Sequence, residues 1–234
     1  PIRYRTEAKD GDVSRYIVEG SPADCVKFGV THLLDRPPDL VVSGINVGEN
    51  SGVSIWYSGT VAAAREGAFW KIPSFAFSVC LKGKPFIGLY ASMVPEIIEM
   101  CLSARSEGLY TEKERVYFNV NFPPCHPSLC KGIRITRQSC AFYNDFYIRR
   151  TDDNGDETFW IDGEKVEVEE SGDYDSRALM SNYISITPLD FDATAQEAYV
   201  AFLQSCRDTG DLPDGLSVEA GAKYLGEQIA LAIT

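Results

Sequence analysis

Short apolar runs alternate with helix-forming segments through the first half of the chain, and this alternation limits the possible fold most strongly. It favours a mostly parallel sheet covered by helices, because each crossover between parallel strands needs a connecting segment that is usually a helix. The strand-like runs are bounded by glycine and proline turns. In order, we predict a strand at 39–45, a helix at 60–67, a strand at 72–79, a helix at 95–106 and a strand at 116–122.

The second half changes character and predicts a protruding β-hairpin arm. Two runs rich in aromatic residues, 142–150 and 158–161, flank Asn154-Gly155, a dipeptide typical of hairpin turns. An isolated hairpin cannot bury so many rings, so we expect this arm to pack on another subunit rather than on its own chain. Beyond it we predict an acidic solvated loop at 165–175, a strand at 183–189 and a surface helix at 193–206.

These elements suggest three regions along the chain. Residues 1–141 form the α/β core, residues 142–206 the hairpin arm with a strand and helix for oligomerisation, and residues 207–234 a helical tail. The chain begins at Pro1, without methionine and without an initial strand. We therefore expect that N-terminal strands of the core precede it.

Composition narrows the possible partners and the compartment. The formal net charge of −12 disfavours DNA and anionic membranes, although backbone N–H groups or a metal ion could still hold a small anion. The seven cysteines are scattered, odd in number and without a CxxC pair, which is typical of reduced thiols. No apolar run long enough to span a bilayer and no signal peptide is present. We therefore expect a soluble cytoplasmic protein.

The first candidate site is an anion-binding turn formed by Ser58, Gly59 and Thr60. These residues precede an alanine-rich helical run. A helix N-terminus offers unpaired N–H groups and a favourable dipole to a phosphate, and the two hydroxyl groups add donors. An ordinary Ser or Thr N-cap would explain the same residues.

The second candidate is Asn46, in a loop that follows a buried strand. Open α/β sheets bind ligands at the carboxyl ends of their strands, and an amide oxygen is a hard ligand suited to Mg²⁺ or Mn²⁺. Ser43 and Asn50, on either side, could support Asn46 in this role. A plain Gly/Asn turn remains the alternative interpretation.

Other chemistry-bearing residues have simpler explanations. Ser21, Pro22 and Asp24 are typical of a helix start, and Cys25 is expected to point into a helix–sheet contact. The cysteines flanking His126 resemble half of a zinc site, but no second ligand pair completes it. The acidic run at 152–156 has the wrong spacing for a calcium loop, and the two histidines lack the partners of a Ser-His-Asp hydrolase.

Taken together, three stretches resemble the SurE family of 5′-nucleotidases, also described as survival-protein acid phosphatases. They are residues 20–26 (GSPADCV), 42–50 (VSGINVGEN) and 57–61 (YSGTV), and residues 132–138 (GIRITRQ) and 183–189 (YISITPL) extend the match. The resemblance implies a Rossmann-like fold and a divalent-metal-dependent phosphomonoesterase acting on nucleoside 5′- or 3′-monophosphates. It also implies a homodimer or homotetramer built through the hairpin arm. Asn46 matches the family's metal ligand, and Ser58, Gly59 and Thr60 match its phosphate-contacting turn.

The chain departs from the family pattern in its metal ligands. The family's adjacent pair of aspartates and a further ligand serine precede the position equivalent to Pro1, and Val47 stands where the family usually has arginine. The catalytic residues are therefore not identified in this chain, which we expect to be truncated and inactive alone. The alternative is a non-catalytic phosphate-binding or assembly module of the same fold. An aspartate pair in the preceding sequence would favour the enzyme.

Overall fold

A computed structural model describes residues 1–106, 115–169 and 172–209. Contacts divide the chain into two units, Pro1–Phe191 and Asp192–Thr234. In the second unit the described structure is helix α6, Gln196–Thr209, which confirms the predicted surface helix. The helix predicted for the tail lies outside the described residues.

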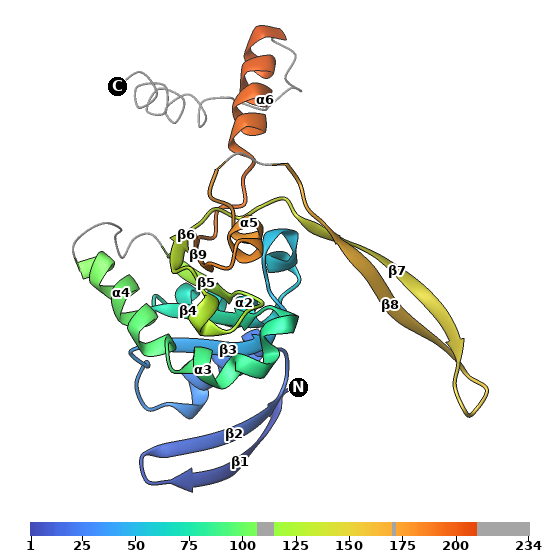
Figure 1. Ribbon diagram of the computed structural model, residues 1–234. Coiled ribbons are helices and arrows are strands. Elements are labelled where there is room, and N and C mark those ends of the chain that lie inside the picture. Colours follow the sequence, from blue (N-terminus) through green and yellow to red (C-terminus); the bar gives the residue numbers. More distant parts are fainter. Residues whose placement is uncertain (107–114, 170–171, 210–234) are drawn as a thin grey trace. The chain divides into compact units, whose positions relative to one another are not determined.

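The first unit is built on a five-stranded sheet with strand order β3-β4-β5-β9-β6 (Figure 1). Strands β3, β4 and β5 run parallel, β9 is antiparallel to β5, and β6 is parallel to β9. The predicted mostly parallel α/β sheet is thus confirmed. The strands are β3 (Val41–Val47), β4 (Ser74–Val79), β5 (Tyr117–Phe122), β9 (Ile184–Leu189) and β6 (Ile133–Ile135).

Helices connect these strands and supply the core. The α-helices are α1 (Pro22–Phe28), α2 (Gly59–Phe69), α3 (Ile87–Ala91), α4 (Val94–Ser106) and α5 (Asp175–Met180). Shorter helical turns are η1 (Gly29–Leu33), η2 (Gly52–Trp56), η3 (Leu81–Phe86) and η4 (Pro127–Leu129). Each strand and helix predicted between residues 39 and 122 is present, with ends that differ by no more than two residues.

The strands β4 and β5 are buried along their whole length because two apolar clusters cover them. One cluster joins the α2 side chains Val61 and Ala64 to Ala76 of β4. The other joins α3 and α4 to the aromatic side chains of β4 and β5, where the rings of Tyr90 and Phe122 stack with centroids 4.5 Å apart. This packing holds the carboxyl ends of the parallel strands in fixed positions.

Strand β3 lies at the end of the strand order, so one of its edges has no strand partner among the described residues. Its Val42 and Val47 side chains are 48% and 39% exposed. An apolar edge of this kind can accept a further strand.

Two hairpins flank the sheet. The predicted arm is formed by β7 (Phe142–Thr151) and β8 (Glu157–Val166), paired in register, and it extends away from the sheet (Figure 1). Asp152 accepts hydrogen bonds from the N–H groups of Asn154 and Asp156, so the acidic run is the hairpin turn that the sequence predicted.

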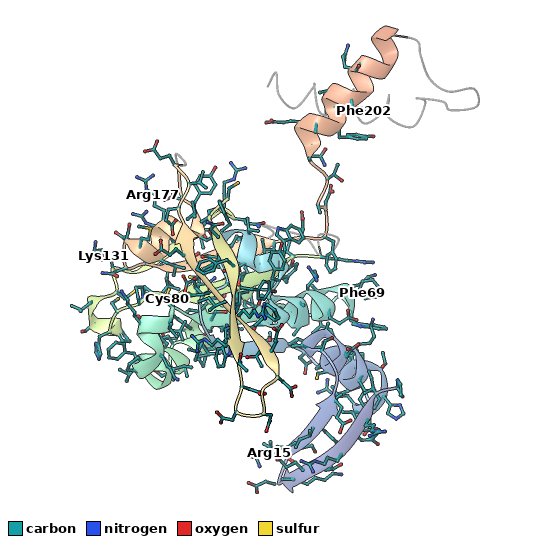
Figure 2. All side chains as sticks on the ribbon, turned by 90° about the vertical axis from the view of Figure 1, so that its right-hand side faces the viewer. Arg15, Phe69, Cys80, Lys131, Arg177 and Phe202 are labelled. Carbon is teal, nitrogen blue, oxygen red and sulfur yellow. The ribbon has the colours of Figure 1, made fainter. Side chains whose placement is uncertain are left out.

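The second hairpin corrects the expectation that the chain has no initial strand. Strands β1 (Arg3–Asp10) and β2 (Val13–Glu19) pair next to α1, and the ring of Tyr4 packs 5.0 Å from that of Phe28. Most of their side chains are charged or polar and exposed, including Arg15, which Figure 2 labels. The strands therefore lack the apolar alternation by which a strand is recognised in sequence.

No single helix among the described residues is long and apolar enough to cross a membrane; the segments 81–91 and 94–104 satisfy that test only as a pair bent by 78°.

Candidate functional site

The candidate site is the loop from Val47 to Ser58, which leaves the carboxyl end of β3 and enters α2. This is the edge of an α/β sheet at which ligands bind. Asn46 is the β3 residue directly before this loop, and Ser58 is its last residue. The structure therefore brings the two predicted sites onto one connection.

Asn46 is oriented by a hydrogen bond within the loop. Its side-chain Nδ2 donates to the carbonyl of Gly48 over 2.8 Å. The pairing of β3 with β4 skips from Ser43 to Asn46, so a bulge separates these two residues. Because the amide nitrogen is engaged, the Oδ1 atom of Asn46 remains as an acceptor that has no partner in the described part of the chain.

Asn46 fits a hard divalent cation as one ligand, since its uncommitted atom is an amide oxygen. A cation needs several oxygen ligands, usually including carboxylates. Within residues 1–106, 115–169 and 172–209, no three His, Cys, Asp or Glu side chains lie close enough together to hold a metal ion. The described residues thus supply one ligand for such a site and do not complete it.

Asn50 is held in place by three polar side chains of the sheet. Its N–H donates to Oδ1 of Asn121 over 2.8 Å, and its carbonyl accepts from Nδ2 of Asn119 over 2.7 Å. Its own Nδ2 donates to Oγ of Ser78 over 2.7 Å. All four residues are buried. Asn50, predicted as a support for Asn46, therefore anchors the loop to β4 and β5.

Asp175 anchors the middle of the same loop, and its position corrects the prediction that 165–175 is a solvated loop. Its side chain is fully buried at the start of α5. One carboxylate oxygen accepts from the N–H of Gly52 over 2.9 Å, and the other accepts from the N–H groups of Ser139 and Ser176 over 3.0 and 2.7 Å. These three hydrogen bonds replace the water that a buried carboxylate loses.

Gly52 fits this anchor because of its backbone conformation. Its φ is +58°, and a Cβ atom there would lie 2.2 Å from the carbonyl oxygen of Ala141. A residue with a side chain would be strained at this φ and would collide with that carbonyl. The N–H of Val53 donates to the same carbonyl over 2.8 Å.

The N-terminus of α2 combines a cap with uncommitted donors. Ser58 is the N-cap, and its Oγ accepts from the N–H of Val61 over 3.1 Å. The N–H groups of Gly59 and Thr60, the next two residues, have no hydrogen-bond partner in the described residues. The ordinary cap predicted as an alternative is present, and it leaves these donors available for an anion.

An ion-pair network that the sequence did not predict joins the arm to the loop. Lys165 of β8 lies 3.4 Å from Glu49 and 3.3 Å from Glu167, and it donates to Oγ of Ser51 over 3.2 Å. The hydroxyl of Tyr143 donates to Glu49 over 3.3 Å. Burial, reinforced by the Glu49 carboxylate, raises the pKa of Tyr143 to about 12, so the phenol keeps its proton. No local pattern signals such long-range partners.

The cysteines near the site do not resemble nucleophiles. Cys80, labelled in Figure 2, lies at the end of β4, where burial and the Glu49 charge raise the pKa of its thiol. A protonated thiol is a weak nucleophile. Cys25 is half-buried after the capping box that Ser21 and Asp24 form, as the sequence predicted.

Comparisons with known proteins agree on one family. The family model described as "Survival protein SurE" matches residues 1–145. A 5′-nucleotidase SurE of Thermus thermophilus is 42% identical over 197 residues, covering 83% of this chain and 74% of the relative. A 5′-nucleotidase SurE of Syntrophus aciditrophicus is 38% identical over 199 residues, covering 85% and 73%. The crystal structure of the SurE protein from Aquifex aeolicus superposes with a TM-score of 0.63 at 33% identity, covering 86% of this chain and 78% of that one.

Proposed function

The chain belongs to the survival protein SurE family, and from this membership and the geometry of the 47–58 loop we propose that it is part of a metal-dependent 5′-nucleotidase. Such an enzyme hydrolyses nucleoside 5′- or 3′-monophosphates to nucleoside and phosphate. One observation carries the proposal. Among the described residues, Asn46, with a free amide oxygen, lies at one end of the 47–58 loop, and the N-terminus of α2, with free N–H groups, lies at the other. Buried side chains such as Asp175 hold the loop between them in place.

Each residue has a defined part in this proposal. The N–H groups of Gly59 and Thr60 and the hydroxyls of Ser58 and Thr60 bind and orient the phosphate. Asn46 holds Mg²⁺ or Mn²⁺, with Ser43 one bulge away on the same strand. When bound, a divalent ion neutralises charge on the phosphoryl group and lowers the pKa of a bound water molecule.

The remaining metal ligands in this proposal are carboxylates on a further strand beside β3. Two observations support that placement: the apolar β3 edge has no strand partner in the described part of the chain, and Asn46 lies on β3 itself. A non-catalytic phosphate-binding or assembly module of the same fold is the second candidate. The absence of a complete metal-ligand set from the described residues favours it. Phosphate release by the full-length protein distinguishes the two.

Replacing Asn46 tests the metal site. In the full-length protein, we expect Asn46→Ala to weaken Mn²⁺ binding at least about 10-fold, since even loss of an outer-shell partner costs that much, and to slow phosphate release from AMP. Titration of Mn²⁺ by electron paramagnetic resonance measures the first effect. Asn154→Ala, which removes an exposed amide from the hairpin turn, is the matched control. If Asn46→Ala binds Mn²⁺ as tightly as the unmodified protein does, Asn46 is not a metal ligand.

We also propose a homodimer or homotetramer assembled through the arm. Two rings of β8 are strongly exposed: Phe159 is 60% and Trp160 57% accessible. Such exposed aromatic surface is typical of an interface. The assembly would be cytoplasmic, since scattered cysteines without a CxxC pair are typical of a reducing compartment.

Shortening the arm tests this assembly. Replacing residues 147–161 with Asn-Gly, a two-residue hairpin turn between the paired residues Phe146 and Asp162, removes these rings but keeps the Tyr143–Lys165 pair that contacts the loop. We expect light scattering at micromolar concentration to show a shift toward monomer. An unmodified protein that is already monomeric, or a shortened one with unchanged mass, would contradict the proposal.

A further inference from the structure

A cavity of about 610 Å³ lies between η2 and the base of the arm. It is separate from the metal ligand Asn46, and nothing in the proposed hydrolysis uses it. Aromatic and aliphatic side chains form most of its lining, and Asp145 adds a carboxylate. The lining includes Tyr57, Phe142, Tyr143, Asp145, Tyr147 and Ile161.

Tyr57 belongs both to the lining of this cavity and to the segment that leads into Ser58, Gly59 and Thr60, the proposed phosphate turn. It directly precedes Ser58, the N-cap of α2, and its side chain is 86% exposed. A large aromatic side chain with so little burial does not stabilise the fold by packing. Tyr57 lines the cavity and is two residues before Gly59, whose N–H is one of the uncommitted donors.

The wall of the cavity that the arm forms is fixed by a hydrogen bond and an ion pair. Tyr143 donates to Glu49, which in turn pairs with Lys165. Tyr147 and Ile161 are directly opposite each other in the β7–β8 register and so share one face of the arm. The arm thus presents apolar surface to the segment that leads into the phosphate turn.

We propose that this cavity binds the base of the nucleotide, with Tyr57 as a stacking residue. The inference rests on the proposed function, because the phosphate turn fixes one end of the substrate beside Tyr57. Every nucleobase has a π-face, so aromatic side chains bind bases with little dependence on sequence. The volume lies in the range of ordinary small-molecule sites. Asp145 accepts a hydrogen bond from an exocyclic amine of the base or from a ribose hydroxyl.

The test compares two substrates that differ in the base alone. AMP and ribose 5-phosphate both carry a 5′-phosphate on ribose. In the full-length protein, we expect Tyr57→Ala to raise KM for AMP about tenfold, with little change in kcat, because the loss of a stacked ring weakens binding. KM for ribose 5-phosphate should not change. Tyr57→Phe should restore the KM for AMP.

Phe202→Ala is the control for loss of an exposed ring, since Phe202 is 73% exposed on α6. Equal increases in KM for both substrates would overturn the inference, because Tyr57 would then act on the phosphate turn rather than on the base. A change of oligomeric state in Tyr57→Ala would also overturn it, since the cavity would then belong to a contact with a second copy.

Adenosine binding, measured by calorimetry, separates this inference from the proposed function. Adenosine has no phosphate and cannot be hydrolysed by a nucleotidase. If the unmodified protein hydrolyses neither substrate, the proposed function fails. Adenosine binding that Tyr57→Ala weakens would still support the base site, and binding that Tyr57→Ala leaves unchanged would refute it.

Discussion

Residues 1–234 alone are expected to release phosphate from nucleoside monophosphates at least about 1000-fold more slowly than a protein that also carries an aspartate-bearing strand beside β3. The reason follows from the proposed mechanism: Asn46 would be one neutral ligand, and no group of three His, Cys, Asp or Glu side chains that could hold a metal ion is present in the described residues. Metal ions contribute several kcal/mol of charge stabilisation to such reactions, and each ~1.4 kcal/mol is a factor of ten in rate. Phosphate release from AMP with added Mn²⁺ measures the difference.

A third protein separates chemistry from folding in this experiment. It carries the added strand with both aspartates changed to asparagine, so the β3 edge is covered but the ligand charge is missing. We expect it to match the complete protein in thermal stability and residues 1–234 in activity. Residues 1–234 hydrolysing AMP as fast as the complete protein would show that the site needs no further aspartates.

Asp175→Ala is expected to cost about 3 kcal/mol or more of folding stability, and roughly 6–12 °C in Tm for a chain of this size. The substitution leaves the buried N–H groups of Gly52 and Ser139 without their acceptor. Because Gly52 begins η2, the loop between Asn46 and Ser58 also loses its central anchor. We therefore expect activity to fall even at temperatures where the variant remains folded.

Asp173→Ala is the matched control for this prediction. Asp173 lies two residues earlier, and among the described residues its exposed carboxylate makes only a 3.4 Å ion pair with Arg134. Exposed pairs contribute about 0–1 kcal/mol, so the control should unfold within a few degrees of the unmodified protein. Calorimetric curves that coincide for the two variants would mean that Asp175 does not anchor the loop.

Local sequence patterns were sufficient to predict much of this fold. The order of strands and helices between residues 39 and 122 follows from apolar runs, glycine and proline turns and an alanine-rich helix, all of which act over a few residues. The Ser58 cap and the Asn154-Gly155 turn are equally local. The place of Asn46 near the carboxyl end of a strand could be predicted in the same way, because it depends only on where that strand ends.

Tertiary structure decided the features that depend on distant partners. Asp175 looked like part of an acidic solvated loop, yet it is buried, since its acceptors meet N–H groups 36 and 123 residues away. Lys165 similarly reaches Glu49 across 116 residues. The first hairpin was missed because exposed charged strands carry no apolar alternation. The sequence by itself determined the order of strands and helices between residues 39 and 122. Only the packing of the arm against the loop created the cavity, because residues far apart in the chain form its walls.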